Sequence, residues 1–330
     1  MIPLREDNYT ITTRDGWLLP MQRTLAPTCF EPTRRPVLIT PGYGMNSFIF
    51  HYHPSGQSMV RCLAEAGFEV WTGSFRGQKA SVKKRWRADR PSLRTLAEQD
   101  VPAMTAAVIA RTQTEVPRHH ARRVDLIGVS LGGAMTYAHL AMNPDNRVGA
   151  VITIGSPLRW EAAHPLLKVA FLSRFLIGLV PMKGSDRMAR MFFPLLARVP
   201  GALSIYINVD HIDLDDAEQI MRTIDVPSRR INRHIAVWMR QKDMVLDGTN
   251  ITDALGAVDK PLLVIHTNRD QIVPEQVSLS VVKAWGGSDI TVLKIGDESD
   301  WYAHADLFMA PRAPELVFGP MADWLTARQE

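Results

Sequence analysis

The sequence has 330 residues, of which 46% are hydrophobic and 22% charged, and this balance excludes wholesale disorder. A chain of this length predicts one large domain, or one domain that carries a long insertion. The net charge of +4 is mildly basic, and we interpret the basic clusters as solvated faces, with attraction to anionic lipid surfaces or acidic substrates left open. No segment resembles a nucleic-acid-binding module, so no nucleic-acid partner is expected.

The cysteine content and the N-terminal segment favour a reducing compartment. Cys29 and Cys62 show no CxxC spacing, so we expect no disulfide framework. Residues 1–17 lack the charged-then-apolar pattern of a signal peptide. The most apolar segment, residues 165–182, is interrupted by Lys168 and Arg174 and falls short of a membrane span. We therefore expect a cytoplasmic protein without integral membrane association, whereas peripheral membrane contact and the oligomeric state stay open.

Short β-like runs recur along the chain, beginning with a hairpin that Asp15-Gly16 predicts. The predicted strands are residues 9–13, 17–24, 36–40, 68–72, 124–129, 148–154, 261–266 and 290–295. Helical patterns lie between or after them, at residues 56–67, 96–112, 131–143, 275–286 and 313–328. Apolar strands that alternate with amphipathic helices predict an α/β fold, with a mostly parallel sheet of the eight-stranded type covered by helices on both faces.

The alternation is interrupted once, over about a hundred residues. Residues 157–258 carry helical signals but no convincing buried strand. An insertion of this length between two strands of one sheet is usually a helical cap over the strand ends, where the active sites of α/β proteins lie. We therefore predict a core of residues 1–156 and 259–330 and a cap or lid of residues 157–258. The Met- and Leu-rich cap favours an apolar ligand, although these residues equally suit packing of the cap onto the core.

One serine lies between a predicted strand and a predicted helix. The run Gly128-Val129-Ser130-Leu131-Gly132 fits G-x-S-x-G in that context, which is typical of a nucleophile held on a sharp turn, the nucleophile elbow. Neighbouring strands and helices crowd such a turn, so side chains two positions before and after the serine would clash, and glycine is required there. Gly-rich turns of this kind also occur for packing or phosphate binding, and the choice depends on catalytic partners.

A serine hydroxyl needs a base, and the base needs an orienting carboxylate. In α/β proteins with a nucleophile elbow, the catalytic residues occur along the chain in the order serine, acid, histidine. Asp270 follows the strand at 261–266, and His304 lies in the loop after the last strand, so Ser130, Asp270 and His304 are the predicted catalytic residues. Asp270 would otherwise be an ordinary turn residue. Other acids flank the last loop: Asp297, Asp300 and Asp306.

Two further sets of residues bear on the chemistry of the site. The backbone N–H groups of Leu131 and Tyr43, the latter after Pro41-Gly42, are the predicted oxyanion donors, although Pro-Gly alone would read as a simple turn. His51 and His53 resemble a metal-binding pair, but no further ligands follow at useful spacing. We therefore expect neither a metal nor an organic cofactor. His266 lies inside a predicted strand and reads as a satisfied core residue.

Six segments together resemble the α/β-hydrolase superfamily, in its acid-lipase and polyhydroxyalkanoate-synthase-like branch. They are "TRDGW", "PGYGMNSFIF", "SFRGQKAS", "GVSLGG", "TNRDQIVP" and "YAHADLF". The resemblance covers nearly all of the chain and implies the α/β-hydrolase fold. In the last segment it implies that His304 is catalytic and that Asp306 is a neighbour rather than the triad acid.

Three departures from these relatives bear on function. Lipases typically carry His-Gly where this chain has Pro41-Gly42. Polyester synthases of the branch use cysteine where Ser130 stands, which argues against polymer synthesis. Secreted lipases have signal peptides and disulfides, and the sequence shows neither.

These patterns together predict a serine hydrolase that cleaves carboxylic esters through an acyl-enzyme. The expected substrate is a small-molecule ester with an apolar or lipid-like acyl group. An acyltransferase would use the same triad, and a non-catalytic binding member of the fold is a further alternative. Epoxide or haloalkane hydrolysis is disfavoured, because those reactions need a carboxylate at position 130.

Overall fold

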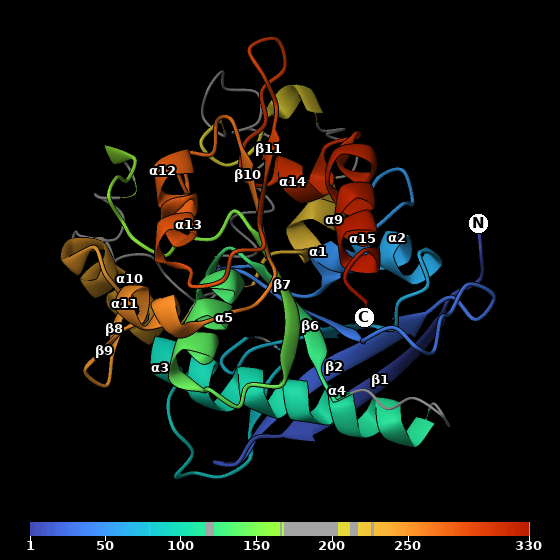
Figure 1. The fold of residues 1–330 in the computed structure, drawn as a ribbon, viewed down its shortest axis with the longest axis horizontal. Helices are drawn as coiled ribbons and strands as arrows, with labels where there is room; N and C mark the ends of the chain where they lie inside the picture. Colours follow the sequence, from blue (N-terminus) through green and yellow to red (C-terminus); the bar gives the residue numbers. More distant parts are fainter. Residues whose placement is uncertain are drawn as a thin grey trace.

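A β-sheet forms the centre of the structure, a computed structural model that describes residues 1–78, 80–115, 122–165, 167, 204–211, 217–225 and 228–329 (Figure 1). The strands lie in the order β1-β2-β4-β3-β6-β7-β10-β11, and a short strand, β5 (Val82–Lys83), pairs with β2. Their bounds are β1 (Arg5–Thr12), β2 (Trp17–Leu25), β3 (Val37–Thr40), β4 (Val70–Gly73), β6 (Val124–Val129), β7 (Val148–Ile154), β10 (Leu262–Thr267) and β11 (Ile290–Ile295).

The strand directions confirm the predicted mostly parallel sheet. β1 and β2 form the predicted antiparallel hairpin, with Gly16 at a φ of 98° in its turn, and β2 is antiparallel to β4. Every other pair along the main order is parallel. The carboxyl ends of the parallel strands therefore meet at one edge, where ligand sites of α/β proteins form.

Hydrophobic packing on both faces explains why the central strands are mostly apolar and fully buried. All six residues of β6 are buried, as a strand covered on two sides requires. On β3, Leu38 belongs to one core cluster, while Val37 and Ile39 belong to the other. The first cluster includes α4 (Val101–Glu115), α5 (Leu131–Met142) and α13 (Ser280–Ala284); the second includes α2 (Met59–Glu65), α14 (Asp306–Met309) and α15 (Gly319–Thr326).

The helices follow the predicted ranges with local differences. The segment 96–112 is a π-helical stretch, η1 (Leu96–Asp100), that continues into α4, and the C-terminal helix likewise begins with η5 (Pro314–Phe318) before α15. The predicted helix at 275–286 is divided into α12 (Glu275–Ser278) and α13. Short elements that the sequence patterns do not predict are β5, α1 (Phe48–His51), α3 (Leu93–Thr95) and α14.

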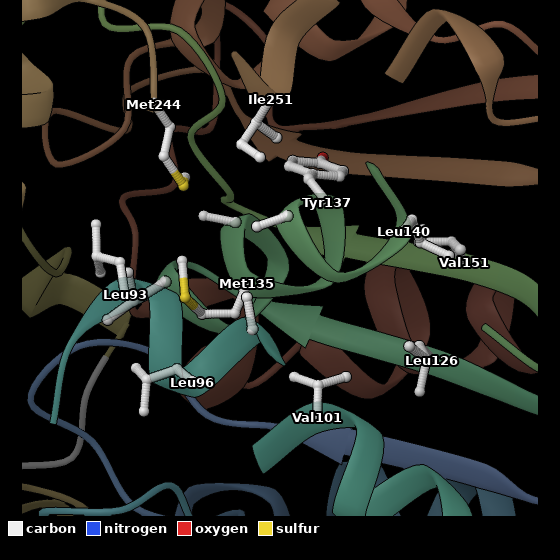
Figure 2. Packing of buried hydrophobic residues seen from close by; sticks show 14 of the residues in the cluster. Leu93, Leu96, Val101, Leu126, Met135, Tyr137, Leu140, Val151, Met244 and Ile251 are labelled. Atoms are coloured by element: carbon white, nitrogen blue, oxygen red, sulfur yellow. The ribbon is translucent and has the colours of Figure 1, made fainter. Parts of the chain in front are cut away.

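The segment between β7 and β10 contains the predicted cap, and its residues 166, 168–203, 212–216 and 226–227 lie outside the described residues. The described elements are η2 (Val209–His211), α9 (Ala217–Arg222), α10 (Arg229–Gln241), β8 (Val245–Leu246), β9 (Thr249–Asn250), α11 (Ile251–Ala254) and η4 (Leu255–Ala257). Met244 and Ile251 share the first core cluster with Met135 and Tyr137 of α5 (Figure 2). The end of this segment therefore packs directly onto the sheet's helical layer.

The structure also bears on the membrane prediction. In the described part of the chain, no helix is both long enough and apolar enough to cross a bilayer. Most of the apolar segment 165–182 lies outside the described residues.

Candidate active site

Ser130 occupies the turn between β6 and α5. Its backbone has a φ of 49° and a ψ of −115°, which an L-residue adopts at a cost of about 1–3 kcal/mol. The surrounding structure holds this conformation, because the Ser130 N–H donates to the Ile154 carbonyl at 2.8 Å and the Ser130 carbonyl accepts from Gly133 at 3.1 Å. The side chain is almost buried, with the residue 8% exposed.

Close packing explains both glycines of the motif. A Cβ atom added at Gly128 would clash with Gly133 Cα, and one added at Gly132 would lie 2.5 Å from the Thr40 carbonyl oxygen. Both contacts are with backbone, which cannot yield as a flexible side chain does. Gly42 is similarly constrained, since its Cβ would lie 2.9 Å from Ser130 Cβ. The chain can therefore bring the serine turn against the loop after β3 only without these side chains.

Asp270 and His304 meet above the same edge of the sheet. The His304 Nδ1 lies 2.6 Å from Asp270 Oδ2, and both side chains are buried. Asp270 Oδ1 accepts the backbone N–H groups of Ile272 and Val273, at 2.9 and 2.7 Å, so each carboxylate oxygen has its own partners. Because the carboxylate accepts, Nδ1 carries the proton and Nε2 is left as an acceptor. This is the tautomer that a general base requires.

A cavity of about 240 Å³ brings the serine and the histidine together. Ser130 and His304 both line it, as do Tyr43 and Leu131. The remaining lining side chains are mainly apolar: Met45, Pro157, Trp160, Leu167, Tyr206, Ile235, Trp238, Met239, Ile272 and Val273. The three predicted catalytic residues and both predicted oxyanion residues thus gather at one site. The rest of the cavity wall presents mainly apolar side chains to a bound ligand.

The predicted oxyanion donors lie on two elements. Leu131 is the first residue of α5, and the first N–H groups of a helix have no intrahelical partner. The loop that carries Tyr43 is tied to the inserted segment: the Tyr43 hydroxyl donates to Asn232 Oδ1 on α10 at 2.6 Å. Burial raises the pKa of this hydroxyl. The Asp225 N–H donates to the Gly44 carbonyl and the Asn46 N–H to the Thr223 carbonyl, both at 2.9 Å.

Asp306 has different hydrogen-bond partners from Asp270, the predicted triad acid. Its carboxylate accepts the N–H groups of Ala303, at 2.7 Å, and Asn208, at 3.0 Å. Burial raises its pKa to about 7. The Ala305 N–H also donates to the Tyr206 carbonyl at 2.8 Å. These bonds join the histidine loop to the segment around residue 206.

Two site residues escaped the sequence patterns. The Tyr206 ring lies 6.1 Å from the His304 ring, and burial raises the pKa of its hydroxyl to about 12. Gly155, directly after β7, has a φ of 53°, and its added Cβ would lie 2.9 Å from His304 Cε1. Neither Tyr206 nor Gly155 belongs to a recognisable sequence motif. A glycine directly after a buried strand is the one weak signal that marks Gly155.

The remaining candidates lie elsewhere. Asp300 contacts His211 at 3.1 Å, and Asp297 accepts from Ser299 within its own turn. His51 contacts the Thr72 hydroxyl at 2.9 Å, whereas His53 contacts the Ala310 carbonyl at 3.0 Å. Across the described residues, no group of three or more His, Cys, Asp or Glu side chains is placed to hold a metal ion. His266 is buried in β10, with Nδ1 3.3 Å from the Thr267 carbonyl.

Comparison with known families identifies the family of the chain. The family described as serine aminopeptidase, S33, matches residues 31–296. The chain belongs to this family. The S33 match begins before β3 and ends just after β11, so it includes Ser130 and Asp270, whereas His304 lies beyond it. Together with the sheet order, it identifies the chain as an α/β hydrolase, as the sequence resemblance predicted.

The curated relatives of this S33 chain include lipases. A probable lipase of Schizosaccharomyces pombe is 28% identical over 158 residues, which are 46% of this chain and 34% of that protein. Triacylglycerol lipase 2 of Arabidopsis thaliana is 28% identical over 145 residues, 40% of this chain and 32% of the lipase. The chain thus covers about a third of the length of these curated relatives.

Among solved structures, a putative aryl esterase from Burkholderia cenocepacia matches with a TM-score of 0.64 and 21% identity. That match covers 98% of this chain and 99% of the esterase. A thermophilic esterase from Thermogutta terrifontis matches with a TM-score of 0.64 and 18% identity, covering 98% and 100% of the two chains. At these identities the likeness establishes the shared fold.

Proposed function

We propose that the protein is a serine hydrolase that cleaves carboxylic esters with an apolar acyl group. The observation that carries this proposal is the cavity shared by Ser130 and His304, with Asp270 bonded to the far side of the imidazole at 2.6 Å. A nucleophile, a base and an orienting acid gathered at one site are the parts that acyl transfer requires.

In the proposed reaction, His304 Nε2 takes the proton of the Ser130 hydroxyl while Oγ attacks the ester carbonyl carbon. The carbonyl π electrons move to oxygen, and the Leu131 and Tyr43 N–H groups stabilise that oxyanion. The intermediate collapses, the bond to the alkoxy group breaks, and His304 returns the proton to the leaving alcohol. Water, deprotonated by the same imidazole, then attacks the acyl-enzyme, and the carboxylic acid leaves as Oγ regains its proton.

The residues that line the cavity favour an ester substrate over a peptide substrate with a free α-amino group. Cleavage next to a free α-amino group requires a partner for that cation, because a buried unpaired charge is strongly unfavourable. Among the described lining residues none carries a carboxylate, and most are apolar. The lipases among the relatives support the same choice. We therefore expect hydrolysis of p-nitrophenyl esters and little turnover of aminoacyl p-nitroanilides.

A panel of p-nitrophenyl acetate, butyrate, octanoate and palmitate tests the proposal, with leucine p-nitroanilide as the competing substrate. The cavity of about 240 Å³ is smaller than those that hold drug-sized ligands, so kcat/KM should peak at short or medium acyl chains. Turnover of the anilide that exceeded turnover of every ester would contradict the ester assignment.

Ser130→Ala separates catalysis by this site from background hydrolysis. We expect kcat to fall by several orders of magnitude, on the order of 10⁴ or more, with the fold retained. Ser288→Ala, at an exposed serine before β11, is the matched control and should keep full activity. A fluorophosphonate should label the parent and the control but not Ser130→Ala. Equal turnover in all three proteins would refute the assignment of Ser130.

A further inference from the structure

A second hollow lies on the far side of α10 from the catalytic cavity. It is a groove of about 850 Å³ between the segment 83–95, which includes α3, and the elements α10 and β8. These elements lie together at one end of the molecule (Figure 1). We call this groove, together with the exposed residues of 82–94 and of α10 beside it, the basic face.

Exposed apolar side chains gather on the basic face. Among the described residues, the large hydrophobic side chains that are exposed number seven, and four of them lie here: Val82 (56% exposed), Trp86 (81%), Val237 (39%) and Val245 (48%). Exposed tryptophan is unfavourable in water and is enriched where proteins meet the membrane–water interface. These exposed apolar side chains would be stabilised by a partner that removes them from water.

The same face is rich in cations. The groove is lined by four basic side chains, Lys83, Arg90, Arg94 and Arg230, and by two acidic ones, Asp89 and Asp247. Asp247 pairs with Arg94 at 2.7 Å. Exposed basic residues continue beside the groove at Lys84, Arg85, Arg87, Arg229 and Arg233. The Arg87 guanidinium lies 4.8 Å from the centroid of the Trp86 ring, so a cation and the most exposed indole form one unit.

The basic face lies next to the catalytic cavity. Ile235 and Met239 of α10 line the catalytic cavity, His234 and Val237 line the groove, and Trp238 lines both. In the sheet, Trp17 at the start of β2 pairs with Lys83 of β5, whereas Met21 pairs with Gly73, the last residue of β4. The segment after β5 is therefore beyond the carboxyl ends of the parallel strands, at the edge where Ser130 lies.

We propose that the basic face is a docking surface for an anionic lipid bilayer. Lysine and arginine side chains would contact lipid phosphates, while Trp86 and the exposed valines enter the headgroup region. A nucleic acid would satisfy the cations but would leave the valines exposed to water, so the combined chemistry favours lipid. Docking requires no catalysis, and its test is independent of whether the proposed ester hydrolysis is correct.

Vesicle flotation tests the proposal with the full chain. The vesicles are pure phosphatidylcholine, or phosphatidylcholine with 30 mol% phosphatidylglycerol, both free of any ester probe. We expect flotation with the anionic vesicles, weak flotation with the neutral ones, and loss in high salt, which screens such contacts. The variant Lys83→Glu/Arg90→Glu should weaken partitioning by about tenfold or more. Trp86→Ala should also weaken partitioning to the vesicles. Trp86→Phe should weaken it less than Trp86→Ala does, because phenylalanine keeps an apolar ring at this position.

The matched control is Arg122→Glu/Arg123→Glu. It makes the same charge change at two exposed residues just before β6, at the opposite edge of the sheet. Circular dichroism and melting temperatures identify any variant that fails to fold. Equal losses in the control and in the Lys83/Arg90 variant would overturn the proposal, because a general charge effect would then explain binding. Binding to a double-stranded DNA oligonucleotide without binding to vesicles would also overturn it.

Discussion

At the scale of single residues, the site depends on how closely the backbone can approach a side chain with a proposed catalytic role. Gly155 shows this at the histidine: its φ is 53°, and a Cβ there would lie 2.9 Å from His304 Cε1 and 3.1 Å from Nδ1. Movement of the imidazole away from such a Cβ would disturb its 2.6 Å contact with Asp270. Gly155 is thus a positioning residue for the proposed base.

Gly155→Ala should therefore impair catalysis. Displacement of a catalytic group by about 1 Å can reduce turnover on the order of 10²-fold, so we expect kcat for a p-nitrophenyl ester to fall at least tenfold. Gly256→Ala is the control, because a Cβ at Gly256 would meet nothing within 4 Å. Urea unfolding distinguishes displacement of the base from loss of the fold. Full activity in a folded Gly155→Ala protein would contradict the positioning role.

The sequence could reveal Ser130, its two glycines and the loops of Asp270 and His304, because their constraint is local or follows strand order. At Ser130, a strand, a sharp turn and a helix follow one another within a few residues, so their packing constraints appear in the sequence as a motif. Gly155 and Tyr206 were missed because their constraint is tertiary: each meets His304 only after distant parts of the chain pack together. The catalytic roles themselves stay predictions until activity is measured.

At the scale of elements, the loop after β3 is held by the inserted segment rather than by the sheet alone. The Tyr43 hydroxyl bonds to Asn232 on α10, and the backbone around Met45 pairs with Ile224. An amide that stabilises an oxyanion must be fixed before the reaction begins. α10 therefore contributes to the proposed oxyanion site without supplying a donor to it.

Tyr43→Phe and Asn232→Ala test this link in a double-mutant cycle. Each change removes the same hydrogen bond, so we expect each to lower kcat several-fold with little change in KM, and the double variant to lose no more than either one. Stopped-flow acylation with p-nitrophenyl acetate provides the measurement. Fully additive losses would show that the two side chains act independently.

Asp306 connects the histidine loop to the segment around residue 206, and its stability effect should depend on pH. Burial raises its pKa to about 7 in the folded chain, against an ordinary value of 3.8. The folded state therefore keeps a proton that the unfolded state releases. The resulting stabilisation is present at low pH and is lost as pH rises through about 7.

Asp306→Asn has no proton to lose and should remove this dependence. We expect the free energy of unfolding of the parent, relative to that of the variant, to be larger at pH 5 than at pH 8. Urea unfolding of both proteins across this range measures the difference. A difference that stayed constant, or increased with pH, would contradict the assignment.

The long periodic elements were predictable, whereas the short ones were not. β6 and α5 follow from a mostly apolar run of six residues, a turn and a helical pattern. β5 has only two residues, both exposed, and exists because β2 extends past β4 and leaves room to pair. Such an element has no hydrophobic periodicity, so only the tertiary arrangement specifies it.

At the scale of the whole molecule, alternating strands and helices were sufficient to predict a mostly parallel sheet covered on both faces. They were insufficient to predict how the inserted segment packs. Met244 and Ile251 belong to the predicted insertion, yet they share the core cluster of α5 (Figure 2). Burial of this kind depends on the shape of the partner surface, which local periodicity does not encode. The division at residue 258 stays a prediction.

The strained turn at position 130 has a consequence for heat resistance. Glycine adopts a φ of 49° without penalty, so Ser130→Gly should relieve about 1–3 kcal/mol of strain, less up to about 1 kcal/mol for greater freedom of the unfolded chain. We expect the inert variant to melt at a higher temperature than the parent in differential scanning calorimetry; an equal or lower melting temperature would contradict this. Laboratory evolution that selected for thermal survival alone would then tend to discard the nucleophile.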